Sequence, residues 1–445
     1  MLSTLQHIHK KTPSWASVYV LDTWAIIDSE AEAMLQALHS RSTWWLMSHL
    51  KILEEKWADD FMSKFYVWYW HKSIWDCWSI TIFVEWVSML GAKAIQDTKL
   101  YNGQEASTRY IDFSQQDIIN PLWSSEWEKL LEDQRSFYLS LLSPLNQYIA
   151  ELYPRWDDQN EKVYNKTVNA KVFDICRWFL PAWCSTNLAW HTTLRQVSDR
   201  ILQLRHHPLP EMNEIADTLL EAVLERFPNS FSSKRYQETD DYLDLVKSEY
   251  YRHKKLENDL LLISNDLKNE KLEKHIDIIN KRPNNKTELP TFIDNIGTLT
   301  FQYLLDFWSF RDVQRHRAPY QRMPLLTTKL WFHNWYLESL SEELKDKAVS
   351  HIRDTKKRID ALDISDQLKQ YYTPMWYMMS CEMMWTLPAL IYMTELRSTT
   401  YVHSTLRQVA IKMWKYIQNL WIKLFLDTST DEFDTRRGKQ DIELN

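Results

Sequence analysis

The most informative stretch for the fold and for the chemistry is a polar segment in the first quarter of the chain. It reads Asn102-Gly103-Gln104-Glu105-Ala106-Ser107-Thr108-Arg109-Tyr110. Alternate residues of an extended segment project to the same side, so an acid, a hydroxyl and an arginine lie together. Ser107 can donate to a phosphate oxygen, Arg109 can bind it in a bidentate fork, and Glu105 can accept from a sugar or base. The set suits a nucleotide monophosphate, and a solvated loop with an ion pair is the alternative.

A dense cationic cluster follows the apolar stretch Phe301–Phe310. It reads Arg311-Asp312-Val313-Gln314-Arg315-His316-Arg317. Positive charge concentrated at the end of a buried element needs an anionic partner, because desolvation and self-repulsion are costly. A ligand phosphate is one candidate, and an acidic patch on the same chain is the other.

Further arginines lie on either side of Pro181. Arg177 is surrounded by apolar neighbours, where an arginine is rarely found without a partner. The helical sequence after Pro181 carries Arg195, Asp199 and Arg205. Arg195 and Asp199 share a helix face, so an ion pair between them is the simplest interpretation, and Arg205 lies further along.

The composition is that of a globular protein. The 445 residues are 44% hydrophobic and 25% charged, enough for one large or two ordinary cores. The net charge of −7 disfavours a general nucleic-acid or membrane-surface binder, and no apolar run reaches the length of a membrane span. We therefore expect a cytoplasmic protein. The cysteines lack CxxC spacing and predict buried thiols and no metal site; they are Cys77, Cys176, Cys184 and Cys381.

The glycine and tryptophan counts are abnormal. The chain has 4 glycines and 23 tryptophans, whereas ordinary usage would give about 31 glycines. Turn-rich positions that favour glycine hold Trp68, Trp70, Trp75 and Trp78. Some bacterial lineages read UGA as glycine, which common translation tables render as stop or tryptophan. We hypothesise that many of these tryptophans are native glycines, with Trp190 and Trp335 as genuine ones. A tryptophan-rich core is the alternative.

The organisation of the chain predicts an α+β, helix-rich fold with two α/β repeats. Residues 1–228 mix helical periodicity with the run Ser79–Val84, which reads equally well as a strand or a buried helix. Residues 229–288 are highly charged and predict a helical connector, 289–427 are again apolar, and 428–445 predict a disordered tail. A Leu-Arg pair recurs at Leu204-Arg205 and Leu396-Arg397, each about two dozen residues after a proline, which favours a repeat.

Together these motifs resemble the flavin-dependent thymidylate synthases in a tandem, two-repeat form, in which the repeats make a pseudo-dimer. The family signature is an R-H-R triplet followed by N-E-x-S-x-R-Y, and here it is split between the repeats. Residues 104–110 match its second part. The place of R-H-R before them holds Asp97, Thr98 and Lys99. The second repeat keeps Arg315-His316-Arg317, but the following places of Glu, Ser and Arg hold Met323, Leu325 and Thr327.

The resemblance extends to a second motif and to single residues. His71-Lys72-Ser73-Ile74-Trp75-Asp76 is similar to the family's flavin-contacting H-x-S/T-x-x-E, with Asp in place of Glu. Two family asparagines that contact flavin are replaced by Thr193 and Asp199. Arginines of the family pattern are matched by Arg177, Arg195, Arg205 and, in the second repeat, Arg397.

The resemblance implies an enzyme that methylates dUMP to dTMP with FAD, NADPH and methylenetetrahydrofolate, and without a cysteine nucleophile. It implies a dUMP site made of Gln104, Glu105, Ser107, Arg109, Arg177 and Arg205, where Arg205 is also the catalytic group that polarises the pyrimidine. It implies a flavin site made of His71, Ser73, Arg195, Arg315, His316 and Arg317.

The family's active sites form where subunits meet. We therefore expect one composite site per repeat pair, within a chain or in a homodimer that rebuilds a four-lobed pseudo-tetramer. The departures from the family pattern leave an alternative, a catalytically inactive homologue that binds nucleotide or flavin or acts as a scaffold.

Overall fold

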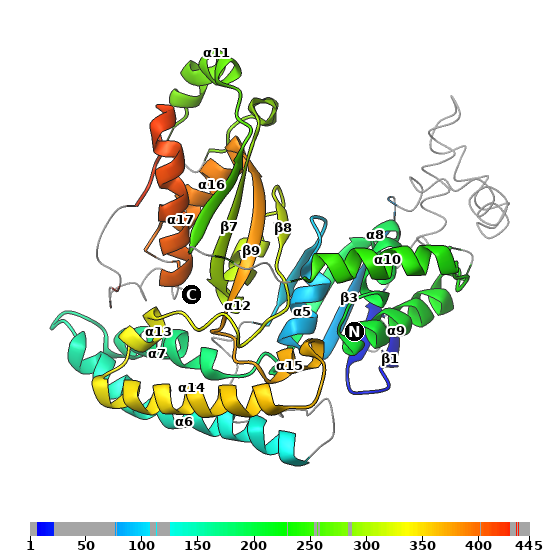
Figure 1. Ribbon diagram of the computed structural model, residues 1–445, viewed down its shortest axis with the longest axis horizontal. Coiled ribbons are helices and arrows are strands. Elements are labelled where there is room, and N and C mark those ends of the chain that lie inside the picture. The colour runs from blue at the N-terminus through cyan, green and yellow to red at the C-terminus, as the bar shows by residue number, and fades with distance from the viewer. Residues whose placement is uncertain are drawn as a thin grey trace. The chain divides into compact units, whose positions relative to one another are not determined.

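The computed structural model forms two compact units (Figure 1). It describes residues 7–21, 76, 78–106, 113, 125–228, 230–252, 256, 259–283, 287–400, 402–427, 433 and 435. The first unit draws on residues 1–107 and 185–249, and the second on 108–184 and 250–445. The combination of helices and sheets confirms the predicted α+β class. The units differ from the predicted domains, because residues 108–184 associate with the second unit, so the repeat boundaries stay a prediction.

The first unit is built on an antiparallel sheet of strand order β1-β2-β3-β5-β4. The strands are β1 His7–Lys11, β2 Ser17–Leu21, β3 Ser79–Ser88, β4 Asn102–Glu105 and β5 Ser185–Thr193. The ambiguous run Ser79–Val84 is thus a strand, in which Ile80, Ile82 and Val84 point into the core.

Short connections join these strands to helices. The helices of the first unit are α5 Met89–Gln96, α8 Leu194–Arg205, α9 Pro210–Arg226 and α10 Gln237–Tyr250. Ser88 ends β3 and caps α5, because its side chain accepts from the Gly91 N–H. Its hydroxyl donates to buried Glu211 at 2.6 Å, which fixes the start of α9 against that cap.

The second unit repeats this arrangement. Its antiparallel sheet has the order β6-β7-β9-β8, which matches β2-β3-β5-β4 of the first unit. The strands are β6 Leu260–Asn265, β7 Thr298–Asp306, β8 Tyr320–Arg322 and β9 Met378–Thr386. The helices that follow β7 and β9 correspond to α5, α8 and α9; they are α12 Phe307–Gln314, α16 Leu387–Arg397 and α17 Ser404–Ile417. Figure 1 shows α16 and α17 packed along this sheet.

A layer of longer helices completes the second unit. Its principal members are α6 Ser125–Leu152, α7 Glu161–Cys176 and α14 Glu342–Ala361, and α6 and α14 lie side by side in Figure 1. The shorter elements are η2 Arg177–Phe179, α11 Asn269–Asn280, η3 Thr291–Ile296, α13 Trp335–Glu338, α15 Asp366–Tyr372 and η4 Gln418–Leu420. No helix among the described residues is long and apolar enough to cross a bilayer.

The connector differs from the prediction. Residues 229–288 contain α10 and α11, but they also contain strand β6, so an entirely helical connector is wrong. β6 forms because it pairs with β7, a long-range contact that supplies the hydrogen bonds its backbone needs. In the tail, Thr435 is buried and accepts from Gln159 through its carbonyl, and disorder of the tail stays a prediction. Most of 428–445 lies outside the described residues.

Tryptophans occupy the two left-handed non-glycine positions of the described chain. They are Trp86, with φ of 59°, and Trp421, with φ of 56°. Trp86 lies in the register shift of β3 between Val84 and Val87, where a bulge with left-handed φ favours glycine. In addition, buried indole nitrogens without an acceptor belong to Trp78, Trp190, Trp376 and Trp385. These observations support native glycine at some positions, but Trp190, expected to be genuine, shares the defect.

Replacing Trp86 with glycine is expected to stabilise the protein. A bulky residue at left-handed φ costs about 1 to 3 kcal/mol, which glycine recovers. Urea unfolding of W86G and wild type measures the difference, and Trp331→Gly is the control, because Trp331 is similarly exposed but does not have left-handed φ. Equal destabilisation by both substitutions would contradict the strain at residue 86.

Candidate functional site

The intact R-H-R triplet lines a pocket of about 470 Å³ in the second unit. Three segments build its walls, residues 288–294, 315–319 and 385–397. Arg315, His316 and Arg317 all line it, because α12 ends at Gln314 and the chain turns toward β8 there. The structure therefore brings these three predicted residues together.

Arg397, the last residue of α16, completes the cationic side of the pocket. Its Nε donates to Nε2 of His316 at 3.1 Å, and its Nη2 donates to the Asp312 carbonyl at 2.7 Å. His316 is the acceptor, so its Nε2 carries no proton. Burial, and then the charge of Arg397, lower the pKa of His316 to about 3, which agrees with a neutral ring. The positive charge of the pocket therefore comes from Arg315, Arg317 and Arg397.

An aromatic wall and two acids face the same space. Trp385 and Tyr392 line the pocket, and the ring of each lies edge-on to His316 at 6.0 Å. Glu288 and Asp294 line it as well. Guanidinium groups beside flat apolar rings and hydrogen-bond acceptors suit a ligand that has phosphates, an aromatic ring and hydroxyl groups.

Thr291 and Asp294 also line the pocket, although the sequence motifs did not predict them as site residues. Ser88 caps α5 and Asp306 caps α12, so these two residues are counterparts. The number of residues between Ser88 and Asp306 is the same as between Ser73 and Thr291. It is also the same as between Asp76 and Asp294. The second unit therefore repeats the S/T-x-x-acid part of the H-x-S/T-x-x-E motif, and both residues line the pocket. The constant spacing between the two units could have revealed this motif in the sequence. Because Leu289 replaces the leading histidine that corresponds to His71, the motif was not recognised.

In the first unit, the described part of the nucleotide signature lies on β4. Gln104 is exposed opposite Ala189 of β5, and Glu105 accepts from Gln96 at 2.6 Å. Four predicted site residues lie outside the described residues, namely His71, Ser73, Ser107 and Arg109. Their roles stay predictions.

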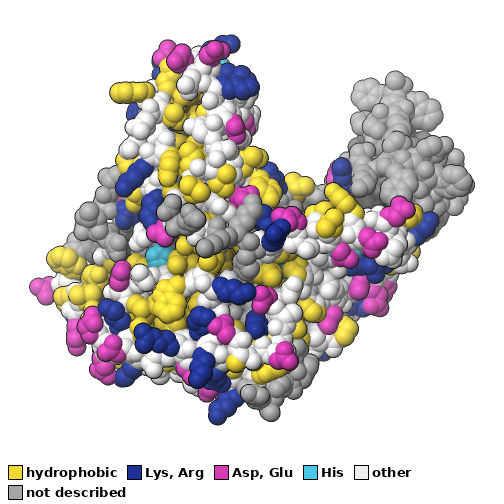
Figure 2. Space-filling model, viewed as in Figure 1, with side chains coloured by type: hydrophobic (Ala, Val, Ile, Leu, Met, Phe, Trp, Pro, Cys, Tyr) yellow, Lys and Arg dark blue, Asp and Glu magenta, His cyan; other side chains and the backbone are white. Residues whose placement is uncertain are grey.

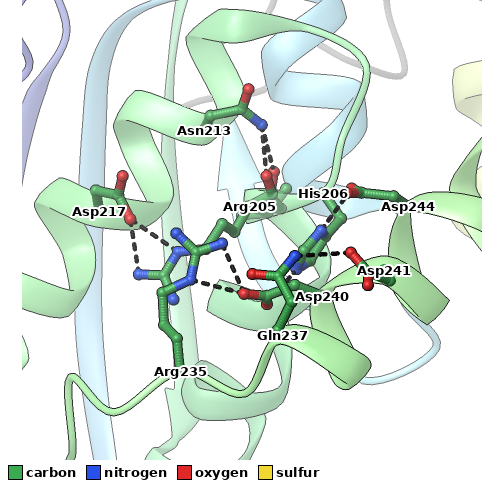
Figure 3. A network of polar contacts seen from close by, with 10 residues as sticks. Arg205, His206, Asn213, Asp217, Arg235, Gln237, Asp240, Asp241 and Asp244 are labelled. Atoms are coloured by element: carbon green, nitrogen blue, oxygen red, sulfur yellow. Dashed lines mark hydrogen bonds and ion pairs between the residues drawn. The ribbon is translucent and has the colours of Figure 1, made fainter.

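The two predicted arginines of α8 have different carboxylate partners. Nη1 of Arg195 lies 2.6 Å from Asp76, a partner distant in sequence, and the pair with Asp199 that helix spacing suggested stays a prediction. Nε and Nη2 of Arg205 donate to Asp217 of α9 at 2.8 and 2.6 Å, as Figure 3 shows. Ten residues of helix separate the two arginines by about 15 Å. The structure does not bring them together in one place.

Arg177 has structural partners in the second unit. It is 3% exposed and pairs with Asp174 at 2.5 Å. Its guanidinium lies 4.1 Å from the ring centre of Trp178 and 5.0 Å from that of Trp308. A carboxylate and two indoles account for an arginine among apolar neighbours. A role for Arg177 in binding dUMP stays a prediction.

The described cysteines are buried thiols, as the sequence predicted. Burial raises the pKa of Cys176 and raises that of Cys184 to about 12, although Arg135 opposes the second shift slightly. Such thiols are not nucleophiles at neutral pH, because the thiolate is the reactive form. Cys381 is buried too, and Cys77 lies outside the described residues.

The lowered pKa of His316 predicts a pH dependence of stability. The unfolded chain takes up a proton at this ring below about pH 6.5, whereas the folded chain does so only near its pKa of about 3. The free energy of unfolding therefore falls as the pH falls through this window. In H316Q, denaturant unfolding should show a shallower dependence, and an unchanged slope would contradict a neutral, buried His316. His9 is a suitable control position, because it is exposed.

Comparisons with known proteins agree with the signature. The family described as thymidylate synthase complementing protein matches residues 22–229. A UPF0159 protein of Chlamydia muridarum is 25% identical over 400 residues, which cover 75% of this chain and 74% of the relative. One of Chlamydia pneumoniae is 24% identical, with coverages of 74% and 72%. One of Thermoplasma acidophilum is 22% identical, with coverages of 84% and 90%.

The three relatives match more of the chain than the family region alone. Coverage of 74% or more cannot fit within residues 22–229, so the similarity extends into the residues that follow. The residues of the nucleotide signature and α8 lie inside the family region, and the pocket lies after it. Residues 22–229 of the chain are therefore similar to the family described as thymidylate synthase complementing protein.

Proposed function

We propose that the protein is an FAD-dependent thymidylate synthase that methylates dUMP to dTMP, with methylenetetrahydrofolate as the carbon donor and NADPH as the reductant. One observation carries the proposal. Arg315, His316 and Arg317 share a pocket with Thr291 and Asp294, so two motifs that resemble the family's flavin motifs meet in one place.

The residues of the pocket fit an anionic dinucleotide such as FAD. Arg315, Arg317 and Arg397 supply guanidinium groups for a diphosphate, which they can bind in a bidentate manner. Tyr392, which is half-buried, offers an aromatic surface for a ring, and Asp294 can accept from hydroxyl groups. The flavin, when bound, supplies the hydride chemistry, and these side chains hold and orient it.

The first unit would supply the nucleotide half. Ser107 and Arg109 would hold the phosphate of dUMP, with Gln104 and Glu105 beside them. Arg205 would polarise the pyrimidine, because a fixed cation stabilises negative charge that develops on the ring. Its bonds to Asp217 fix the guanidinium and leave its Nη1 for a substrate oxygen.

The assembly follows from the division of the signature. We propose two tandem repeats per chain and a homodimer with the four lobes of a pseudo-tetramer. The equal strand order of the two sheets supports the repeat.

The surface charge is mixed. Basic and acidic side chains are interspersed on the face shown in Figure 2, and the net charge of the chain is −7.

An inactive homologue that binds flavin or nucleotide, or serves as a scaffold, is the second candidate. The observation that favours it is the engagement of first-unit residues with one another. Asp97 replaces the first arginine of R-H-R and pairs with Lys93 at 3.1 Å, and Arg195 pairs with Asp76. Asp97 stands at a position, and Arg195 is a residue, that the family pattern assigns to flavin binding. Both side chains are engaged in ion pairs within the protein.

Turnover of dUMP separates the two candidates. Purified protein with FAD, NADPH and methylenetetrahydrofolate should form dTMP, and oxidation of NADPH should depend on dUMP. An Arg315→Ala variant is the matched negative control. Bound flavin without formation of dTMP would contradict the enzyme and favour the inactive homologue.

A further inference from the structure

A buried ion pair joins the end of the connector to the helix that carries Arg397. Arg282 follows α11, and Glu395 lies on α16. Nη1 of Arg282 donates to Oε2 of Glu395 at 2.9 Å, and Nη2 donates to Oε1 at 2.5 Å. The side chains are only 4% and 10% exposed. A buried bidentate pair holds its two segments in one orientation, because both hydrogen bonds must form together.

The same guanidinium holds the wall of the pocket. Nη1 of Arg282 also donates to the carbonyl of Thr287 at 2.9 Å. The next residues, Glu288 and Leu289, line the pocket, followed by Thr291 and Asp294. Arg282 therefore fixes the start of the segment that lines the pocket together with the R-H-R triplet.

The C-terminal segment 421–427, which we call the strap, covers this ion pair. The N–H of Phe425 donates to Oε1 of Glu395 at 2.9 Å, and the Phe425 ring lies 5.2 Å from the Arg282 guanidinium. Asn280 at the end of α11 donates to the Trp421 carbonyl at 3.2 Å and accepts from the Lys423 N–H at 2.7 Å.

The other end of the strap is fixed beside the end of α16. The Asp427 N–H donates to the Ser398 hydroxyl at 3.2 Å, and the Asp427 side chain accepts from the Thr400 N–H at 3.1 Å. The strap thus runs from α11 to the residues that follow Arg397. The ion pair lies beneath it, shielded from water.

The first unit has no carboxylate in the corresponding place. Arg205 and Arg397 are the last residues of α8 and α16, and the same spacing relates Gln203 to Glu395. The ion pair is therefore not a requirement of this arrangement of strands and helices. The Arg282–Glu395 ion pair belongs to the second unit, which is also the unit that contains the cationic pocket.

We propose that Arg282 and Glu395 are positioning residues that hold residues 287–296 in place as a wall of the cationic pocket, with the strap as their cover. The identity of FAD as the ligand rests on the proposed function, whereas the positioning of the wall does not. Loss of one partner leaves a buried charge without its counter-charge, so the wall should loosen where Arg282 binds Thr287.

Hydrogen exchange of the unliganded protein tests the positioning directly. In Glu395→Gln, amides of residues 287–296 and 421–427 should exchange at least about tenfold faster, while those of β7 and β9 stay unchanged. Lys329→Ala is the matched control, because it breaks an exposed ion pair with Asp366 in the same unit. Exchange at 287–296 equal to that of wild type would overturn the proposal.

A second variant separates positioning from general stability. Arg282→Met with Glu395→Met removes both buried charges, which hydrophobic residues of similar volume tolerate well. We expect its Tm to recover toward that of wild type, while exchange at 287–296 remains fast and the Kd for FAD remains raised at least about tenfold. Wild-type affinity in this double variant would contradict a positioning role.

The two readouts keep the proposals distinct. If wild type fails to bind FAD, the proposed function is contradicted, and exchange at 287–296 still decides whether the ion pair fixes the wall. If wild type binds FAD and Glu395→Gln binds it equally well, the positioning role is overturned and the function stands.

Discussion

Replacing Arg315 and Arg397 together with alanine is expected to abolish flavin binding at micromolar concentrations. A hydrogen bond to a charged group contributes about 1.5 to 3 kcal/mol, so loss of two guanidinium groups should weaken binding by roughly two to four orders of magnitude. Arg397 has a second role, because it holds neutral His316 through Nε2. Titration of the protein with FAD, followed by quenching of flavin fluorescence, measures the change.

The controls distinguish charge from geometry. Arg397→Lys keeps a cation but loses the two directed bonds to His316 and Asp312, so it should bind FAD with intermediate affinity. Lys329→Ala removes an exposed cation of the same unit and should leave affinity unchanged. A change of less than about threefold in the double alanine variant would exclude this pocket as the flavin site.

Replacing Ser107 and Arg109 together with alanine is expected to remove turnover of dUMP and to leave flavin binding intact. These residues carry the nucleotide half of the signature, and loss of a bidentate phosphate contact should lower kcat/KM by at least about a hundredfold. A dTMP assay and a flavin titration on the same preparation measure both effects. Equal loss of flavin binding would contradict the division of the signature into two halves.

Mixing the inactive variants tests the proposed homodimer. The Ser107 and Arg109 double variant keeps the pocket with Arg315, and an Arg315 variant keeps the nucleotide half. If sites form between chains, mixed dimers contain one complete site and activity returns. Persistent inactivity after subunits have exchanged would place both halves of each site on one chain.

Local sequence patterns predicted the strand and helix content where packing agreed with them. Ser79–Val84 was ambiguous, because a short apolar run has no decisive period, and its pairing with β2 and β5 made it a strand. The connector strand β6 was missed, because its leucines also fit helical spacing and only pairing with β7 decides between the two.

The site was predictable where it rests on a continuous motif. Arg315, His316 and Arg317 were assigned together and line one pocket. Long-range partners were not predictable, since local helix spacing gives no sign that Arg195 pairs with Asp76, which is 119 residues away. Thr291 escaped because its motif lacks the leading histidine, and only the structural alignment of Ser88 with Asp306 reveals the shared spacing.

The central claim is that the second unit holds one flavin in the pocket of Arg315, His316, Arg317 and Arg397. The most direct test is the visible absorbance spectrum of purified protein after addition of FAD and removal of the unbound excess. We expect the bands of bound flavin at one equivalent per chain, and their loss in the Arg315 and Arg397 double variant. A folded protein that stays colourless, or a double variant that retains the bands, would contradict the account.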